Sequence, residues 1–284
     1  MRAYVPEYDL VAPTNLPDAL ALIADQRRPI AGGTDLMVLF EAGKLPYRRL
    51  VSLQGIAELR EIAADPSYVT IGALATYTEI QQHEIIHREF PLLVRAASWT
   101  GAVATQNRGT LAGNIANASP AADSPPALLV YDAELELLSS RGQRWVPYAS
   151  FHIGYKTSIM APDEMIGHIR VPRTTLDCIQ YLRKVGTRRA QAISKVALAG
   201  LAKVDAGKVE RIRIALASVA PIPLRCLETE KVLHGRHLDR ALIEEAKLKL
   251  AAEIAPISDI RSTDDYRRFV AANLLQEFLE SVLS

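Results

Sequence analysis

Short apolar runs and amphipathic stretches alternate through the first 60 residues of the chain. Residues 16–23 carry apolar positions at helical spacing behind a capping Asn15 or Thr14. Residues 28–31 and 49–53 are brief apolar runs flanked by polar residues, which is typical of strands. The pattern predicts a compact unit that mixes helices and strands.

A second unit of the same kind is predicted over residues 61–150. Residues 68–72 and 133–138 are patterned as strands, and the second of them alternates as a half-buried strand does. Residues 100–126 are small and polar without a clear period, and such a long irregular segment inside a domain is more often functional. Helices are predicted to begin at three places: Thr76 or Thr78, Pro91 and Pro125.

Beyond a predicted boundary near residues 170–180, the pattern changes to antiparallel hairpins followed by helices. Three alternating runs are expected to be strands, and Gly207 supplies the positive φ that the turn between the last two requires. Two closing helices are predicted, the second behind a capping sequence at residues 262–265. The strands are expected at 179–185, 195–204 and 209–219, and the helices at 238–254 and 266–283.

Composition and charge exclude several classes of function. The 284 residues are 49% hydrophobic and 23% charged with a formal net charge of +1, as in an ordinary globular protein, and the length suggests two domains. No block of basic residues predicts nucleic-acid binding, and no apolar run is long enough to predict a membrane span. The absence of an apolar leader and the two cysteines, Cys178 and Cys226, favour a reducing cytoplasm.

No metal site is predicted within this chain. The two cysteines form no Cys-x-x-Cys pair, and iron–sulfur or zinc sites usually need four protein ligands. His83 and His87 have the spacing of neighbours on one helix face, but no third ligand is evident, so a solvated helix is favoured. A basic cluster, Arg183-Lys184 with Arg188-Arg189, is compatible with either a solvated strand end or an anion contact.

Two small-residue loops are the strongest chemical signal in the chain. The first is Ile-Ala-Gly-Gly-Thr-Asp-Leu at residues 30–36, and the second is Thr-Leu-Ala-Gly-Asn at residues 110–114. Loops without bulky side chains bring backbone N–H groups close to an anion such as a phosphate. A single glycine pair is more often a plain turn. Two such loops in successive units predict a clamp on the two phosphates of a dinucleotide.

These loops and their surroundings resemble one family, the FAD-binding medium subunit of molybdenum hydroxylases of the carbon monoxide dehydrogenase and xanthine dehydrogenase type. The resemblance extends nearly from end to end. It includes residues 31–36, the run Gln-Asn-Arg-Gly-Thr-Leu-Ala-Gly-Asn-Ile-Ala-Asn-Ala-Ser-Pro at 106–120, and Asp123. It also includes Glu-Met-Ile at 164–166 and the run from Tyr181 to Arg189.

The resemblance implies a specific set of FAD contacts. The first loop would surround the pyrophosphate and the second would close on it, while Asp123 would accept hydrogen bonds from ribityl or ribose hydroxyls. Ile166 would pack along the cofactor, and Lys184 would approach it from the C-terminal side. Trp99 or Val103 is expected to touch the flavin just before the second loop. The implied contact residues are Pro29, Ile30, Ala31, Gly32, Gly33, Thr34, Asp35, Leu36, Val103, Thr110, Leu111, Ala112, Gly113, Asn114, Asp123, Ile166 and Lys184.

The same resemblance implies the fold and the activity. The expected class is α+β, with a two-lobed FAD-binding domain of the vanillyl-alcohol-oxidase type over residues 1–175 (lobes about 1–60 and 61–175). A small antiparallel sheet packed on helices would follow over 176–284. The subunit would pass electrons from [2Fe–2S] clusters of a small partner through FAD to NAD, a quinone or oxygen. Molybdenum would lie in a large partner subunit, and no side chain here would act as acid or base.

One departure from the family pattern and three alternatives remain at this point. The family usually has glycine where this chain has Ala112, and an alanine would be unfavourable if that position needed a positive φ. A stand-alone flavin oxidase and a cofactor-free scaffold subunit are the alternative functions, and Ala112 is the residue that favours the second. For Asp123, the alternative role is to cap the helix predicted at Pro125.

Overall fold

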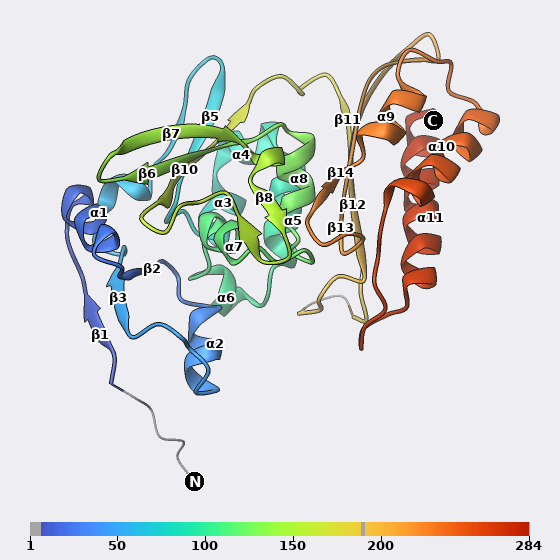
Figure 1. Ribbon diagram of the computed structural model, residues 1–284. Helices are drawn as coiled ribbons and strands as arrows, with labels where there is room; N and C mark the ends of the chain where they lie inside the picture. Colours follow the sequence, from blue (N-terminus) through green and yellow to red (C-terminus); the bar gives the residue numbers. More distant parts are fainter. Residues whose placement is uncertain (1–6, 189–190, 284) are drawn as a thin grey trace.

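The computed structural model describes residues 7–188 and 191–283, which form two lobes and a C-terminal region. The first lobe, at the lower left of Figure 1, has a parallel three-stranded sheet of order β1-β3-β2. The predicted cap of its first helix is confirmed, since the Asn15 side chain accepts from the backbone N–H of Asp18 at 2.9 Å. Its elements are β1 (Asp9–Val11), α1 (Leu16–Ala24), β2 (Arg28–Ile30), α2 (Leu36–Glu41) and β3 (Arg49–Ser52).

The second lobe is built on an antiparallel five-stranded sheet of order β4-β5-β10-β6-β7. Thr76 starts the helix that was predicted at Thr76 or Thr78, through a capping box with Glu79. The strands are β4 (Ile62–Ala64), β5 (Tyr68–Gly72), β6 (Glu134–Ser139), β7 (Gly142–Pro147) and β10 (Met165–Pro172), with a separate hairpin of β8 (His152–Gly154) and β9 (Thr157–Ser158). The helices are α3 (Tyr77–Gln82), α4 (Glu84–Glu89), α5 (Pro91–Trp99), α6 (Val103–Gln106), α7 (Leu111–Asn117) and α8 (Pro125–Val130).

Two expectations for the second lobe were wrong. The segment 100–126 is not irregular throughout, because it contains the short helices α6 and α7, which are too brief to show a period in sequence. Strand β6 is not half-buried either, since Glu136 on its polar face is 7% exposed. His168 Nδ1 lies 2.5 Å from a carboxylate oxygen of Glu136. This contact offsets the cost of burying the carboxylate.

The C-terminal region is a four-stranded antiparallel sheet of order β11-β12-β13-β14, covered on its outer side by three helices (Figure 1). In the turn that joins β12 to β13, Gly207 has a φ of +79°, as predicted. Helix α9 was not predicted. The elements are β11 (Ile179–Val185), β12 (Val196–Asp205), β13 (Lys208–Ala217), β14 (Leu224–Arg225), α9 (Leu227–Leu233), α10 (Arg240–Glu253) and α11 (Asp264–Leu283).

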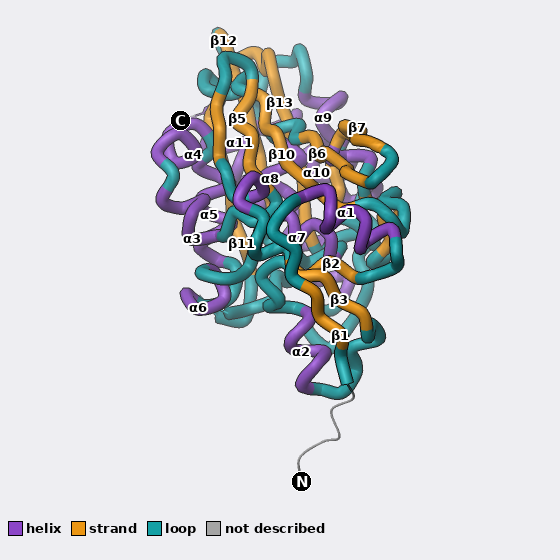
Figure 2. Tube along the Cα trace, turned by 90° about the vertical axis from the view of Figure 1, so that its left-hand side faces the viewer, coloured by secondary structure: helices purple, strands orange, loops and turns teal. Residues whose placement is uncertain are grey.

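Both faces of the C-terminal sheet are buried. Successive residues of β12 belong to different cores: Leu198 packs with the C-terminal helices, whereas Ala199 packs with the second lobe. Figure 2, turned by 90°, shows the same sheet behind the second lobe, with the first lobe below. The predicted α+β class, with two lobes followed by an antiparallel sheet packed on helices, is confirmed.

Charged groups hold the C-terminal region against helix α8. Arg225 donates to the carbonyl of Leu129 and to Asp132, each at 2.8 Å, and Arg213 donates to the carbonyl of Val130 at 2.9 Å. Arg225 also forms a buried pair with Glu230, whose carboxylate accepts the backbone N–H of Ile214 at 2.7 Å. Burial raises the pKa of Glu230, and the adjacent Arg225 opposes that rise. Two arginines therefore cross the junction, and Arg225 has partners on both sides of it.

His152, at the start of β8, is buried in its neutral form. Its Nε2 atom lies 3.2 Å from the Tyr148 hydroxyl, and its ring packs edge-on against Phe151. Burial lowers the pKa of His152 to about 4, because the charged imidazolium is poorly solvated there.

This burial predicts a pH-dependent loss of stability. The unfolded chain takes up a proton at His152 near pH 6.5, whereas the folded chain does so only near pH 4, so the stabilisation is complete above pH 6.5 and falls as the pH is lowered towards 4. Between pH 7 and pH 5 we expect the wild-type chain to lose about 1–2 kcal/mol more than His152→Leu. Urea unfolding at the two pH values measures this. Equal losses in the two proteins would contradict it.

Candidate functional site

The first glycine loop lies against residues 108–109, which directly precede the second loop. A Cβ atom placed on Gly32 would lie 1.8 Å from the carbonyl oxygen of Arg108 and 3.0 Å from the Cα of Gly109. The segment before the second loop also pairs with the start of α3, where the N–H of Tyr77 donates to the carbonyl of Gly109 at 3.1 Å. Gly33 adopts a φ of +76°, which favours glycine. The absence of side chains thus allows the loops to come together.

Four consecutive amides of the first loop are available to a ligand. Among the described residues, the backbone N–H groups of Gly32, Gly33, Thr34 and Asp35 donate to no acceptor. Backbone donors are normally paired, and a row of unpaired amides in a glycine loop is a concave binding site for an anion. The carbonyl of Gly33, in contrast, accepts from the N–H of Met37 and fixes the loop to helix α2.

The second loop is the first turn of helix α7. Thr110 caps this helix, and its side chain accepts the N–H of Gly113 at 3.0 Å. Ala112 lies inside the helix, and the positive φ of this stretch occurs later, at Ala118 (φ +51°). Position 112 therefore needs no glycine for its backbone conformation.

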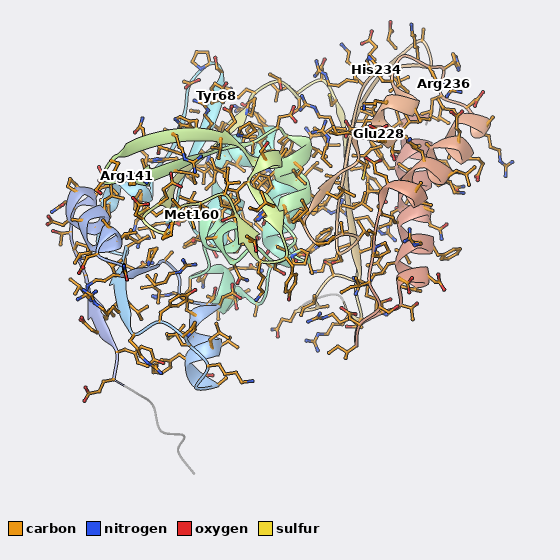
Figure 3. The ribbon with its side chains drawn as sticks, in the orientation of Figure 1. Tyr68, Arg141, Met160, Glu228, His234 and Arg236 are labelled. Carbon is orange, nitrogen blue, oxygen red and sulfur yellow. The ribbon has the colours of Figure 1, made fainter. Side chains whose placement is uncertain are left out.

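A cleft of about 1100 Å³ runs along both loops and is lined by all three parts of the chain. This size suits a large organic ligand. Met160, labelled in Figure 3, lines it from the segment after β9. The first lobe contributes Gly32 and Tyr47, and the second lobe contributes Asn114 and Ile166. Ser194 and Arg267 come from the C-terminal region.

Most of the sequence-predicted contact residues line this cleft, but five do not. The fully buried Leu111 packs in the core, and Ile30 packs against Gly33 beneath the loop. Val103 is 69% exposed and does not line the cleft, so the expectation that it or Trp99 touches the flavin stays a prediction. Asp123 lines a smaller adjoining cavity of about 320 Å³, and Lys184 lines neither. The predicted residues that line the cleft are Pro29, Ala31, Gly32, Gly33, Thr34, Asp35, Leu36, Thr110, Ala112, Gly113, Asn114 and Ile166.

Asp123 and Lys184 form a buried pair between the second lobe and β11. Lys184 Nζ lies 2.6 Å from one carboxylate oxygen, and the hydroxyl of Ser194 donates to the other at 2.7 Å. Burial raises the pKa of Asp123, while Lys184 and Ser194 act in the opposite direction. Asp123 does not cap helix α8, because Ser124 occupies that position. Its partners tie it to the wall of the cleft, since Ser194 lines the cleft directly.

Three residues that line the cleft have a buried polar atom without a partner within residues 7–188 and 191–283. These atoms are the side-chain oxygen of Asn114, the hydroxyl of Tyr77 and the Nε of Arg267. Buried polar atoms are rarely left without a hydrogen bond, so unpaired ones at a cleft indicate a missing ligand or water. Together with the four free amides, they fit a polar ligand such as a dinucleotide.

The described residues of the basic cluster and the histidine pair noted in the sequence lie outside the cleft. Arg183 pairs with Glu277 at 3.1 Å, and Arg188 donates to the carbonyl of Gln191, whereas Arg189 lies outside the described residues. His83 is the residue before helix α4. In the described part of the chain, no three His, Cys, Asp or Glu side chains are grouped to hold a metal ion. None of its helices is long and apolar enough to cross a membrane.

Several residues of the cleft carried no signal in sequence. Lys156 lines it from the turn between β8 and β9, and Ile257, Asp259 and Arg267 line it from the C-terminal region. These side chains come from one hairpin turn, one loop and helix α11, which the tertiary fold brings to the cleft. No local motif marks them.

Models of two protein families match consecutive parts of the chain. The model described as the FAD binding domain in molybdopterin dehydrogenase matches residues 6–174, and the CO dehydrogenase flavoprotein C-terminal domain matches residues 181–282.

Curated proteins and solved structures match over nearly the whole chain. The xanthine dehydrogenase FAD-binding subunit of Escherichia coli O157:H7 is 32% identical over 95% of this chain and 92% of its own length. The glyceraldehyde dehydrogenase medium chain of Sulfolobus acidocaldarius is 32% identical over 98% and 99%. A chain of carbon monoxide dehydrogenase from Hydrogenophaga pseudoflava superposes with a TM-score of 0.92 at 27% identity, covering 96% of both chains.

Proposed function

This chain belongs to the FAD-binding medium subunits of molybdenum hydroxylases, and on that premise we propose that it holds FAD in the cleft and passes electrons from a partner's iron–sulfur clusters to an external acceptor. The row of free amides at residues 32–35 is the observation that carries the proposal, because a diphosphate needs many donors and little side-chain bulk. Bound FAD supplies the redox chemistry, and this chain binds, orients and shields it.

The contact residues follow from the arrangement of the cleft. The amides of the 32–35 loop surround the diphosphate, and the first turn of α7 closes on it from the second lobe. The side-chain oxygen of Asn114 and the Tyr77 hydroxyl accept or donate hydrogen bonds along the ligand. Asp123 and Lys184 act together, with the carboxylate towards the ribityl or ribose hydroxyls and the ammonium as a fixed positive charge near the flavin. Ile166 packs along the cofactor from β10.

The wider assembly is also a proposal. The large partner carries the molybdopterin and oxidises the substrate, and the small partner carries two [2Fe–2S] clusters. The acceptor is NAD, a quinone or oxygen. A cytoplasmic location is supported by the two free thiols, Cys178 and Cys226. We place the domain boundary at residue 175, where the five-stranded sheet ends and the four-stranded sheet has not begun.

Absorbance spectroscopy of the gently purified full-length chain tests the proposal. We expect an oxidised-flavin band at about 450 nm, and heat-released FAD in a ratio of about one per chain. If FAD is neither retained nor taken up on titration, the protein is a cofactor-free subunit. Purification from the native cell by an affinity tag then examines the partners. A larger and a smaller chain that carry molybdenum and iron are expected, whereas a flavin-loaded chain alone would indicate a stand-alone oxidase.

A further inference from the structure

The hairpin of β8 and β9 has a firmly held base and an exposed tip at the cleft. At the base, the N–H of Ile159 donates to the carbonyl of Phe151 at 3.0 Å, and His152 is buried. At the tip, Tyr155 and Lys156 are exposed and line the cleft. Lys156 has a φ of +53°, in the left-handed region that non-glycine residues seldom adopt. The turn therefore presents a lysine to the cleft from a rigid support.

The cations that line the cleft differ in whether they already have partners. Arg261 and Arg267 both contact the carboxylate of Asp259, at 3.4 and 2.8 Å. The guanidinium of Arg28 lies over the ring of Tyr47, 5.0 Å from its centroid. Lys156 has neither a hydrogen bond nor an ion pair with any described residue. It is the ammonium group of the cleft that is open to a ligand.

The field of Lys156 reaches the loop of free amides. Asp35 contributes the last of those amides, and burial raises the pKa of its carboxyl group. Lys156 and Asp35 line the same cleft, and Lys156 is the charged residue that acts against this rise. A diphosphate at the amides would meet the Asp35 carboxylate and would need a nearby cation.

We propose that Lys156 is the cation that balances the diphosphate of the dinucleotide at the 32–35 loop, so that the β8–β9 hairpin holds the ADP half of the cofactor. The proposal rests on the proposed function, because it takes FAD as the ligand of the cleft. On this proposal, the affinity that FAD shares with ADP comes in part from the positive charge of Lys156, a residue of the second lobe. Charge-assisted contacts of this kind are about twice as strong as neutral ones.

Affinity measurements on the full-length apo chain test this assignment. FAD binding is followed by quenching of flavin fluorescence and ADP binding by calorimetry, in wild type, Lys156→Gln, Lys156→Arg and the matched control Lys249→Gln on α10. We expect Lys156→Gln to weaken FAD and ADP about tenfold each, with a shallower dependence on salt. Lys156→Arg should recover most of the affinity. Lys249→Gln should bind both ligands as the wild type does.

Three outcomes decide the matter. Unchanged ADP and FAD affinity in Lys156→Gln overturns the proposal, and so does a loss for FAD without a loss for ADP, which would place Lys156 at the flavin. The Asp35→Asn background removes the remaining alternative: if Lys156→Gln has no effect there, Lys156 merely neutralises Asp35. If the wild-type chain itself binds no FAD, the proposed function is wrong. That result differs from wild-type binding that Lys156→Gln leaves unchanged, so the two failures are distinguishable.

Discussion

Replacement of Gly32 by alanine is expected to abolish FAD binding and to lower the free energy of unfolding by at least about 3 kcal/mol. The new methyl group would lie 1.8 Å from the carbonyl oxygen of Arg108, and no flexible side chain there can move aside. The two glycine loops would be forced apart, and with them the amides that face the diphosphate. This position has the tightest predicted clash of all the described glycines.

Gly154→Ala is the matched control, because its new Cβ would meet only the Cβ of Thr157 at an ordinary 3.9 Å. Urea unfolding monitored by circular dichroism gives the stabilities, and titration with FAD gives the affinities. The control is expected to keep its stability within experimental error of the wild type. A Gly32→Ala protein that folds normally and binds FAD would show that the loops do not need their close approach.

Arg225→Met is expected to cost about 3 kcal/mol of stability, the second-largest effect that the structure predicts. The substitution leaves the Glu230 carboxylate buried without its cation, and loss of one partner from a buried pair is strongly destabilising. It also removes the hydrogen bonds to the Leu129 carbonyl and to Asp132 that hold α8 against the C-terminal sheet. We therefore expect weaker packing of α8 against the C-terminal sheet, as well as a lower denaturant midpoint of unfolding.

The double variant Arg225→Met/Glu230→Gln distinguishes the buried charge from the lost hydrogen bonds. It should recover part of the stability, because no uncompensated carboxylate remains. Arg236→Met is the control, since Arg236 pairs with Glu245 at the surface and its loss should change stability little. Denaturant midpoints of the four proteins provide the comparison. If Arg225→Met behaves like Arg236→Met, the junction does not depend on this arginine.

Local signals in the sequence were sufficient to predict helix caps, one hairpin turn and the two glycine loops. Asn15 and Thr76 bond their helix N-termini, and Gly207 lies at the hairpin turn, because each of these outcomes depends on backbone geometry within a few residues. The glycine loops were found for the same reason, since the chemistry belongs to the main chain. Helices α6 and α7 were missed because a single turn or two of helix leaves no period to detect.

The rest of the cleft depends on contacts between distant segments. Val103 was placed beside the ligand from its position before the second loop, yet the short helix α6 turns it to solvent. Lys156 and Arg267 had no signal, because their places at the cleft follow from tertiary packing, more than a hundred residues from the first glycine loop. For Asp123, both partners come from beyond residue 180, which no local pattern reveals.

The position of Arg267 in the wall of the cleft has a consequence for biosynthesis. This side chain, on α11, donates to the carbonyls of Lys195 and Ser218, and the N–H of Ser218 donates in turn to the carbonyl of Pro120 beside the second loop. A ribosome must have passed codon 267 before that wall is complete, although the glycine loops emerge much earlier. Full enclosure of the cofactor therefore waits until helix α11 has been made. Because a ligand that binds only the folded state adds to its stability, the flavin supply of the cell would set how much of this subunit survives proteolysis.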